Sequence, residues 1–221
     1  MPGASSAIHL KPAADLAQRV LLPGDPHRAL AVAQALLEQP KMFNHHRGLW
    51  GYTGTARDGE LLTVQATGMG GPSAAIVVEE LIALGATTFI RIGTCGALRD
   101  GREIGDLVRV RSALALDGTS RALGANGSVS PDPDLSAAID APDAIAATVD
   151  LFYGGPEPEG ADVVEMECAT LFTIAELRGV RAAAVLGVSD ALAGGRTRIE
   201  PERLEALGLE LGEAAWAALT R

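Results

Sequence analysis

Hydrophobic residues recur along the chain in two alternating patterns, short β-branched runs and longer runs with helical spacing. The short runs predict strands at residues 19–22, 48–55, 61–67, 87–93, 105–116 and 181–188. The longer runs predict helices at residues 26–38, 73–84, 165–177 and 201–220. Strands that alternate with helices indicate an α/β fold, and the hairpin signal Asp58-Gly59 indicates that the sheet is mixed. Without an internal repeat or a linker, the pattern predicts a single domain over residues 1–221, with a central mixed β-sheet flanked by helices.

Two stretches follow neither pattern. Residues 117–150 are rich in Gly, Pro, Ala and Asp, and no regular element is predicted there. Residues 154–161, with the sequence GGPEPEGA, are predicted to form a flexible acidic loop.

Composition and charge narrow the classes of partner. Hydrophobic residues make up 48% of the 221 positions, which suits an α/β domain with a full core. A net charge of −10 and a pI near 4.8 disfavour general binding to nucleic acid or to an anionic membrane. No apolar run reaches transmembrane length, and residues 1–20 lack the basic and apolar regions of a signal peptide. The two cysteines, Cys95 and Cys168, cannot build a disulfide framework or a zinc cluster, which favours a cytoplasmic location.

The predicted strand at residues 87–93 contains an arginine among apolar positions. Arg91 interrupts the sequence TTFIRIG, and a buried guanidinium is costly unless it meets an anion or a carboxylate. The following residues, Gly93-Thr94-Cys95-Gly96, are predicted to form a turn that offers a hydroxyl and several backbone N–H groups. Two interpretations stay open: a phosphate site at the carboxyl end of the strand, or a structural pair between Arg91 and a core carboxylate.

Three predicted turns with glycine follow predicted strands, in the sequences PGDPHR (23–28), TGMGGPS (67–73) and RIGTCG (91–96). In an open α/β sheet such turns meet at one edge, where backbone N–H groups and helix N-termini favour an anion. With Arg28, Arg91 and Thr94 attached, they indicate a site for a small tetrahedral oxyanion. None of the three matches the Walker pattern or a dinucleotide fingerprint.

Two acidic motifs can face such a site. The sequence VEMEC (164–168) puts Glu165 and Glu167 at the start of a predicted helix, as dipole-favoured acids or as acceptors for sugar hydroxyls. Ser189-Asp190 follows a predicted strand and supplies either a cap or an acid that protonates a leaving group. The histidines have no metal-ligand spacing, so no metal site is predicted.

Six longer motifs occur along the chain in the order LLPGDPHRA, NHHRGLWGYTGT, TGMGGPSAAIVVEEL, FIRIGTCGAL, VVEMECATLF and LGVSD. This order resembles the hexameric nucleoside phosphorylases, the family that includes bacterial purine nucleoside phosphorylase and uridine phosphorylase. The resemblance covers nearly the whole chain and is weakest over residues 117–162. It implies a nucleoside phosphorylase-like fold and a reaction of nucleoside with phosphate that gives free base and ribose 1-phosphate. It implies no cofactor, because inorganic phosphate is a co-substrate.

The resemblance also implies which residues hold phosphate. Gly24 and Arg28 in the PGDPHR motif would bind it, together with Arg91 and Thr94 in the RIGT motif. Arg47 in the NHHRG motif would reach the phosphate in a neighbouring subunit's site. The implied assembly is a homohexamer built as a trimer of dimers.

On the ribose side, the resemblance implies that Met166 and Glu167 hold the 2′ and 3′ hydroxyls, with Glu165 beside them. His9 in the short IHL motif would reach the ribose 5′ end in a neighbouring subunit's site. A pair of subunits would then complete each other's sites.

On the base side, the resemblance implies that Phe152, in the DLFY motif, stacks near the base and that Ser189 faces it. Asp190 would protonate purine N7. Arg203 follows Asp190 at a spacing similar to that of the arginine that assists this acid in the purine enzymes.

The choice of base is the least determined part of this prediction. Asp190 favours purine nucleosides, because uracil has no N7 to protonate. The sequences GMGGPS and LDGTS (116–120) are closer to uridine phosphorylases, although the 150–165 region lacks a glutamine-x-arginine clamp for uracil. We therefore predict a purine nucleoside phosphorylase that acts in purine salvage, with uridine phosphorylase as the alternative.

Two other classes fit the residues less well. A hydrolytic nucleosidase uses water and would not need Arg28, Arg47 and Arg91. A catalytically silent nucleoside-binding protein leaves the joint occurrence of arginines, glycine turns and carboxylates unexplained.

Overall fold

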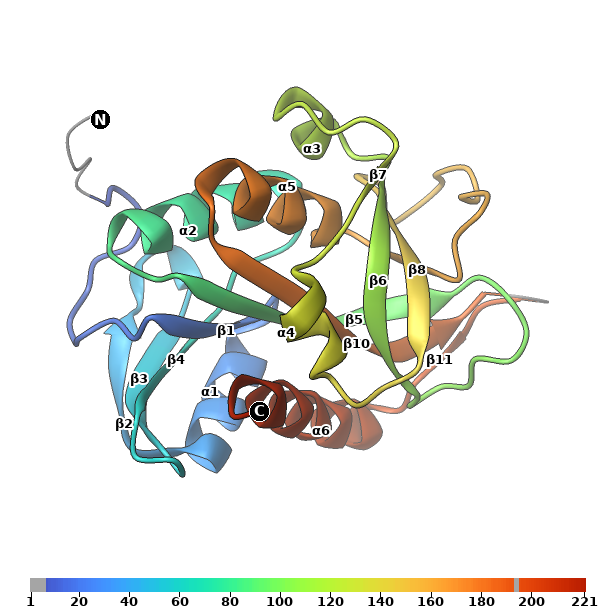
Figure 1. Cartoon of the computed structure of the whole chain (residues 1–221). Coiled ribbons are helices and arrows are strands. Elements are labelled where there is room, and N and C mark those ends of the chain that lie inside the picture. Colours follow the sequence, from blue (N-terminus) through green and yellow to red (C-terminus); the bar gives the residue numbers. More distant parts are fainter. Residues whose placement is uncertain (1–6, 193–194) are drawn as a thin grey trace.

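The computed structural model describes residues 7–192 and 195–221 (Figure 1). Its strands form an 11-stranded mixed sheet in the order β11-β10-β6-β8-β9-β5-β1-β4-β3-β2, with β7 beside β6. The predicted α/β fold with a mixed sheet and flanking helices is confirmed. The predicted domain of residues 1–221 begins in residues 1–6, which lie outside the described part of the chain.

The strands are β1 (Arg19–Pro23), β2 (Leu37–Asn44), β3 (Gly51–Ala56), β4 (Leu61–Gln65), β5 (Thr88–Ala97), β6 (Leu107–Ala115), β7 (Ser128–Val129), β8 (Asp143–Thr148), β9 (Val163–Glu165), β10 (Arg181–Ala191) and β11 (Thr197–Arg198). The helices are α1 (Pro26–Leu36), α2 (Gly71–Ala83), α3 (Gly118–Ala122), α4 (Pro133–Ala137), α5 (Cys168–Arg178) and α6 (Pro201–Leu219), with a 3-10 turn η1 (His46–Gly48). None of these described helices is long and apolar enough to cross a membrane.

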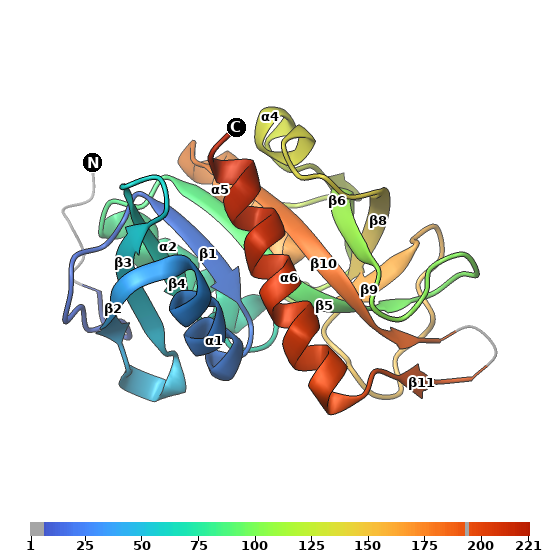
Figure 2. The same cartoon turned by 90° about the horizontal axis from the view of Figure 1, so that it is seen from below.

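Helices cover the sheet from both sides, with α2 and α5 on one face and α1 and α6 on the other (Figures 1 and 2). The side chains of β5 alternate between these layers, as the pleat of a strand requires. Phe89 belongs to the apolar cluster of α2 and α5, whereas Ile90 and Ile92 belong to the cluster of α1 and α6. Arg91 therefore points to the α5 side, where Glu165 and Glu167 precede the helix.

Five strands close into a ring at one end of the sheet. β5 pairs with β10, β10 with β6, β6 with β8, β8 with β9, and β9 again with β5. The pattern of the sequence does not predict this closure, because it depends on pairings between strands that lie far apart in the chain. The ring brings the end of β9, with Glu165, next to the strand that carries Arg91.

The sequence patterns do not predict β2, β7, β8, β9 and β11. The predicted helix at residues 26–38 ends at Leu36, because the following residues pair antiparallel with β3. β8 is rich in alanine, a residue depleted in strands, so its local strand signal is weak. β9 is three residues long, so the helix predicted from residue 165 begins only at Cys168.

The segment Gly93-Thr94-Cys95-Gly96 is a correction to the sequence-based prediction. It continues β5 to Ala97 and is not a turn, because it pairs with β10 on one side and, at Gly96, with β9 on the other. The strand conformation still leaves Thr94 half-buried near the carboxyl end of β5.

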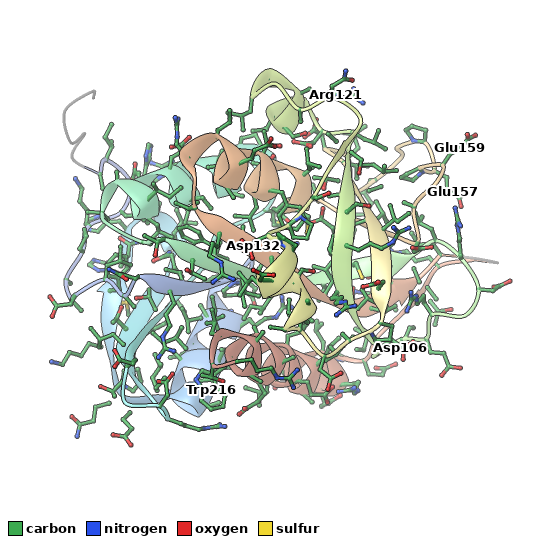
Figure 3. All side chains as sticks on the ribbon, in the orientation of Figure 1. Asp106, Arg121, Asp132, Glu157, Glu159 and Trp216 are labelled. Atoms are coloured by element: carbon green, nitrogen blue, oxygen red, sulfur yellow. The ribbon has the colours of Figure 1, made fainter. Side chains whose placement is uncertain are left out.

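The acidic segment at residues 154–161 forms a loop between β8 and β9, as predicted. Glu157 and Glu159 are exposed on this loop, at the outer edge of the molecule (Figure 3). Their charges are therefore solvated and need no partner in the core.

Two glycines of α6 allow it to approach α1 closely. A Cβ at Gly212 would come within 2.8 Å of Cγ1 of Val32, and one at Gly208 within 3.3 Å of Cγ of Arg28. Both pairs lie one helical turn apart, so the side chains of α1 fit into a groove of α6. This contact fixes the first turn of α1, which carries Arg28.

We expect Gly212→Val to lower the free energy of unfolding by about 1–3 kcal/mol, because the added side chain would overlap Val32. Urea denaturation monitored by circular dichroism measures this loss. Glu205→Ala, at an exposed position of the same helix, is the control and should change stability by less than about 0.5 kcal/mol. Equal stability of the two variants would contradict the close α1–α6 contact.

Candidate active site

The candidate site lies where parallel strands end. β1 is parallel to β4 and β5, and β5 is parallel to β10, so their carboxyl ends meet at one edge of the sheet. The turns after β1 and β4 are joined there, because the N–H of Thr67 donates to O of Pro23 and the N–H of Gly68 to O of Gly24. The expectation that these two glycine turns meet at one edge is therefore correct.

The centre of this edge is the buried guanidinium of Arg91. Its Nε donates to Oε2 of Glu165 at 3.1 Å, and its Nη2 lies 2.5 Å from Oε2 of Glu167. Burial acts to lower the pKa of Arg91, but the charges of Glu167 and Glu165 outweigh it and raise that pKa. Of the two interpretations that the sequence left open, the pair with core carboxylates is present in the structure.

Glu165 is a fully bonded carboxylate. It accepts hydrogen bonds from Arg91, from Oγ1 of Thr148 at 2.5 Å, and from the backbone N–H groups of Glu167 and Cys168. These donors come from β5, β8 and the start of α5, so the side chain ties three elements together. The oxygens of Glu165, beside the predicted ribose residues Met166 and Glu167, are thus already engaged by the protein.

Glu167 connects Arg91 to the glycine turn after β4. Its Oε2 contacts Arg91, and its Oε1 accepts from the N–H of Gly70 at 2.5 Å. Gly70 has a φ of 84°, a conformation that favours glycine and turns its N–H toward the carboxylate. Burial raises the pKa of the Glu167 carboxyl, although the charge of Arg91 acts to lower it. Met166, between the two acids, is half-buried.

Arg28 lies in the first turn of α1, three residues after the capping residue Asp25. Its Nη1 is 3.5 Å from O of Ile92 on β5. Burial lowers the pKa of Arg28, the charge of Asp25 opposes this, and the charge of Arg91 lowers it further. Arg28 thus reaches the carbonyl of the residue that follows Arg91, and an anion at this edge of the sheet would have two guanidinium groups nearby.

Ser189 and Asp190 lie at the end of β10, both buried. Oγ of Ser189 is 2.7 Å from Oδ2 of Asp190 and 3.3 Å from O of Cys95. Nε of Arg196 donates to Oδ1 of Asp190 at 2.8 Å. The guanidinium of Arg196 also covers the half-exposed ring of Phe152, 4.5 Å from its centroid. Arg196 therefore links the predicted acid to the predicted base-stacking residue.

The arginine that contacts Asp190 in the structure is not the one that the sequence predicted. Arg203 pairs with Glu210 on the same helix, with Nη1 2.5 Å from Oε1, and contacts O of Gly105. Arg196 occupies the predicted position because β11 folds back antiparallel on β10, with Arg198 opposite Asp190. Spacing along the chain cannot reveal this, since the hairpin decides which arginine faces the acid.

His9 and Arg47 lie apart from this cluster. Nδ1 of His9 is 2.7 Å from Oε1 of Glu80 on α2. Arg47 is exposed in η1 with a φ of 59°, and within the described residues no ion pair joins it to the other predicted phosphate residues. That His9 and Arg47 complete the site of a neighbouring subunit stays a prediction.

The turn that carries Arg47 is held by two buried amides. Nδ2 of Asn44 donates to O of Leu49 at 2.5 Å and to O of His46 at 3.3 Å, and Nε2 of Gln65 donates to O of Leu49 at 3.0 Å. These bonds stabilise the left-handed backbone at Arg47.

Sequence reasoning missed four residues that support the site: Glu80, Thr148, Asn44 and Arg196. Each acts through a partner that is distant in the chain or lies across a hairpin, and no local pattern marks it. The charged sequence RTR (196–198) close after Asp190 is a signal that could have found Arg196. In the described ranges, no three His, Cys, Asp or Glu side chains gather in a way that could hold a metal ion.

Comparisons with known proteins identify relatives of this chain. The sequence profile of the family described as "Phosphorylase superfamily" matches residues 18–215. The DeoD-type purine nucleoside phosphorylase of Caldanaerobacter subterraneus is 39% identical over 210 residues, which cover 86% of this chain and 89% of the relative. The protein of the same name from Geobacillus kaustophilus is 37% identical over 208 residues, with coverage of 86% and 87%.

A relative with a different name is also similar to this chain. The uridine phosphorylase of Thermococcus kodakarensis is 36% identical over 204 residues, which cover 79% of this chain and 73% of the relative. The matched ranges include the strands and helices that form the site. The chain therefore belongs to the phosphorylase superfamily.

Proposed function

We propose that the protein is a pentosyltransferase that splits purine nucleosides with inorganic phosphate. The observation that carries this proposal is the cluster in which Arg91 contacts Glu167 while Nη1 of Arg28 lies 3.5 Å from O of Ile92, the residue after Arg91. It combines two cations for a phosphate with an acceptor for sugar hydroxyls at one edge of the sheet. The names of the relatives from Caldanaerobacter and Geobacillus support the purine substrate.

The phosphate is held by the residues at the ends of β1 and β5. Arg28, Arg91 and the hydroxyl of Thr94 bind the phosphate oxygens. Gly24 has no side chain, so the backbone there can come close to the phosphate. The bound dianion stabilises the positive charge that develops on the ribose and then attacks the anomeric carbon. The new C–O bond forms on the sugar while the C–N bond to the base breaks, so phosphate is a co-substrate and no cofactor takes part.

The ribose hydroxyls are bound next to the phosphate. Glu167 accepts from the 2′ and 3′ hydroxyls, since each of its oxygens has a lone pair beyond the one used by Arg91 or Gly70. Met166 covers the sugar ring. Glu165, fully bonded by the protein, holds Arg91 and the start of α5 in place for this task.

The base leaves with the electron pair of the broken C–N bond and needs a proton at N7. Asp190 in its carboxylic-acid form donates that proton and is left as a carboxylate, which the guanidinium of Arg196 stabilises. Ser189 lies at the second oxygen of Asp190, and Phe152 stacks near the ring. We assign the orientation of Asp190 to Arg196, which contacts it directly, and not to Arg203.

Uridine phosphorolysis is the second candidate. The relative from Thermococcus kodakarensis bears the name uridine phosphorylase and covers a large share of this chain. Asp190 argues for the purine, because its carboxyl lies buried at the base side and uracil has no N7 to receive a proton.

The proposal includes an assembly and a location. We propose a homohexamer built from dimers, in which His9 and Arg47 complete the neighbouring subunit's site; both side chains lie away from their own cluster, which supports this. We also propose a cytoplasmic enzyme of purine salvage, in keeping with two free cysteines, Cys95 and Cys168, both buried.

Base release from inosine, guanosine, adenosine and uridine, with and without phosphate, tests the proposed function directly. We expect release from at least one purine nucleoside only when phosphate is present, with ribose 1-phosphate as the second product. Release without phosphate would indicate a nucleosidase, and release from uridine alone would indicate the second candidate.

We expect Arg28→Ala to raise the KM for phosphate by about 10- to 100-fold, because the variant loses one charge-assisted hydrogen bond to the phosphate. Arg28 suits this test better than Arg91, because removal of Arg91 would leave two buried carboxylates without their cation. Arg178→Ala, at a surface ion pair with Glu79, is the control and should leave phosphate kinetics unchanged. An unchanged phosphate KM in folded Arg28→Ala would remove Arg28 from the phosphate site.

We expect Asp190→Asn to lower kcat for inosine by about 10²- to 10⁴-fold, because the amide cannot protonate N7. The loss should be far smaller for 7-methylguanosine. The base of this nucleoside already carries a positive charge, so it leaves as a neutral molecule without receiving a proton. Steady-state kinetics on both substrates measure the difference, and thermal melting checks the fold. Equal losses would mean that Asp190 positions the base or supports the fold.

We expect a mixture of Arg28→Ala and Arg47→Ala subunits to regain activity after exchange. In a mixed dimer one site keeps both arginines, so about a quarter of all sites in an equal mixture should work. The control mixes Arg28→Ala with the double variant Arg28→Ala/Arg47→Ala, which restores no complete site. If exchange is verified by mass and activity stays low, each subunit forms its site alone.

A further inference from the structure

Three consecutive backbone N–H groups converge on one carboxylate far away in the sequence. Glu80 of α2 accepts from the N–H of Ile8 at 3.1 Å, of His9 at 3.0 Å and of Leu10 at 2.7 Å. The same carboxylate lies 2.7 Å from Nδ1 of the His9 ring. Leu10 is fully buried in the apolar cluster of α2 and α5, so the segment is anchored on both sides of His9.

We infer that Glu80 is the positioning residue that presents the His9 imidazole to a ribose 5′ hydroxyl in the neighbouring subunit. This inference rests on the proposed function and on the role of His9 within it. A carboxylate at Nδ1 keeps the proton on that nitrogen and leaves Nε2 as a hydrogen-bond acceptor. The 5′ hydroxyl is a donor that such an acceptor recognises.

The hydrogen bond between Glu80 and the His9 ring is not needed to hold this segment of the chain on α2. The three backbone N–H groups would hold residues 8–10 on α2 without it. The contact at Nδ1 removes the rotational freedom of an imidazole that is one-third exposed, with 31% of its side-chain surface accessible. A fixed ring loses less entropy when it binds a ligand.

The charge of Glu80 is maintained by these contacts. Burial acts to raise the pKa of its carboxyl, but the hydrogen bonds from Leu10, His9 and Ile8 together lower that pKa. At neutral pH the group is therefore an anion, which is the stronger acceptor for the Nδ1 proton.

The chain offers a matched control next to this residue. Glu79 lies on the same helix and pairs with Arg178 of α5 at 2.8 Å, on the surface. Glu79→Gln removes one carboxylate charge from α2, as Glu80→Gln does, without touching the segment of His9. Glu80→Ala is a second variant that removes the acceptor altogether.

The test compares inosine with 5′-deoxyinosine, which lacks the hydroxyl in question. For the wild type we expect kcat/KM to favour inosine. Glu80→Gln and His9→Ala should each reduce that preference by about tenfold, the effect of one hydrogen bond, and the double variant should reduce it no further. Glu79→Gln should keep the preference of the wild type.

Two outcomes would overturn the inference. If Glu80→Gln and Glu80→Ala lower kcat/KM equally for both nucleosides, Glu80 only supports the fold. If the losses of Glu80→Gln and His9→Ala multiply in the double variant, the two residues act independently.

A second measurement does not depend on turnover. Nitrogen NMR of the labelled imidazole should report a proton on Nδ1 of His9 in the wild type and in Glu79→Gln, and a change of tautomer in Glu80→Ala, which has no acceptor for that proton. An unchanged tautomer would refute the positioning role even if the enzyme were inactive. Absence of phosphate-dependent base release by the wild type would instead refute the proposed function.

Discussion

The rest of the site depends on the pairing of one buried cation with two buried anions. Arg91 lies in the middle of β5, where an isolated guanidinium would be strongly unfavourable, and the carboxyl groups of Glu165 and Glu167 supply its partners. Loss of one partner from such a buried set costs about 3–5 kcal/mol, because the other charge stays behind. The pairing therefore couples the stability of the protein to the geometry of its active site.

This coupling explains why the two carboxylates have different tasks. Glu165 uses its oxygens for Arg91, Thr148 and the start of α5, so it organises the protein and has little left for a ligand. Glu167 bonds to Arg91 and to one backbone N–H of the glycine turn, so each of its oxygens keeps a further lone pair. A ligand bound as proposed would enter a network that the protein has already ordered, which would reduce the entropy lost on binding.

The sequence by itself determined the fold class and the family, and it named the residues of the candidate site. Hydrophobic periodicity predicted six strands and four helices that the structure contains, because each has a strong local signal. The position of Arg91 in an apolar strand pointed to a buried charge with a partner, and the motif around Glu167 supplied the acid. Ordered motifs gave the family, which the comparison with known sequences confirms.

Only the tertiary structure decided how these parts meet. The closed ring of β5, β10, β6, β8 and β9 depends on pairings between distant strands, and short or alanine-rich strands such as β9 and β8 carry no clear local signal. The same holds for Arg196, which the β10–β11 hairpin brings to Asp190 while Arg203 turns toward Glu210. Local sequence fixes which residue types are present, but long-range backbone pairing decides which charges lie within hydrogen-bond distance, and that distance sets the chemistry.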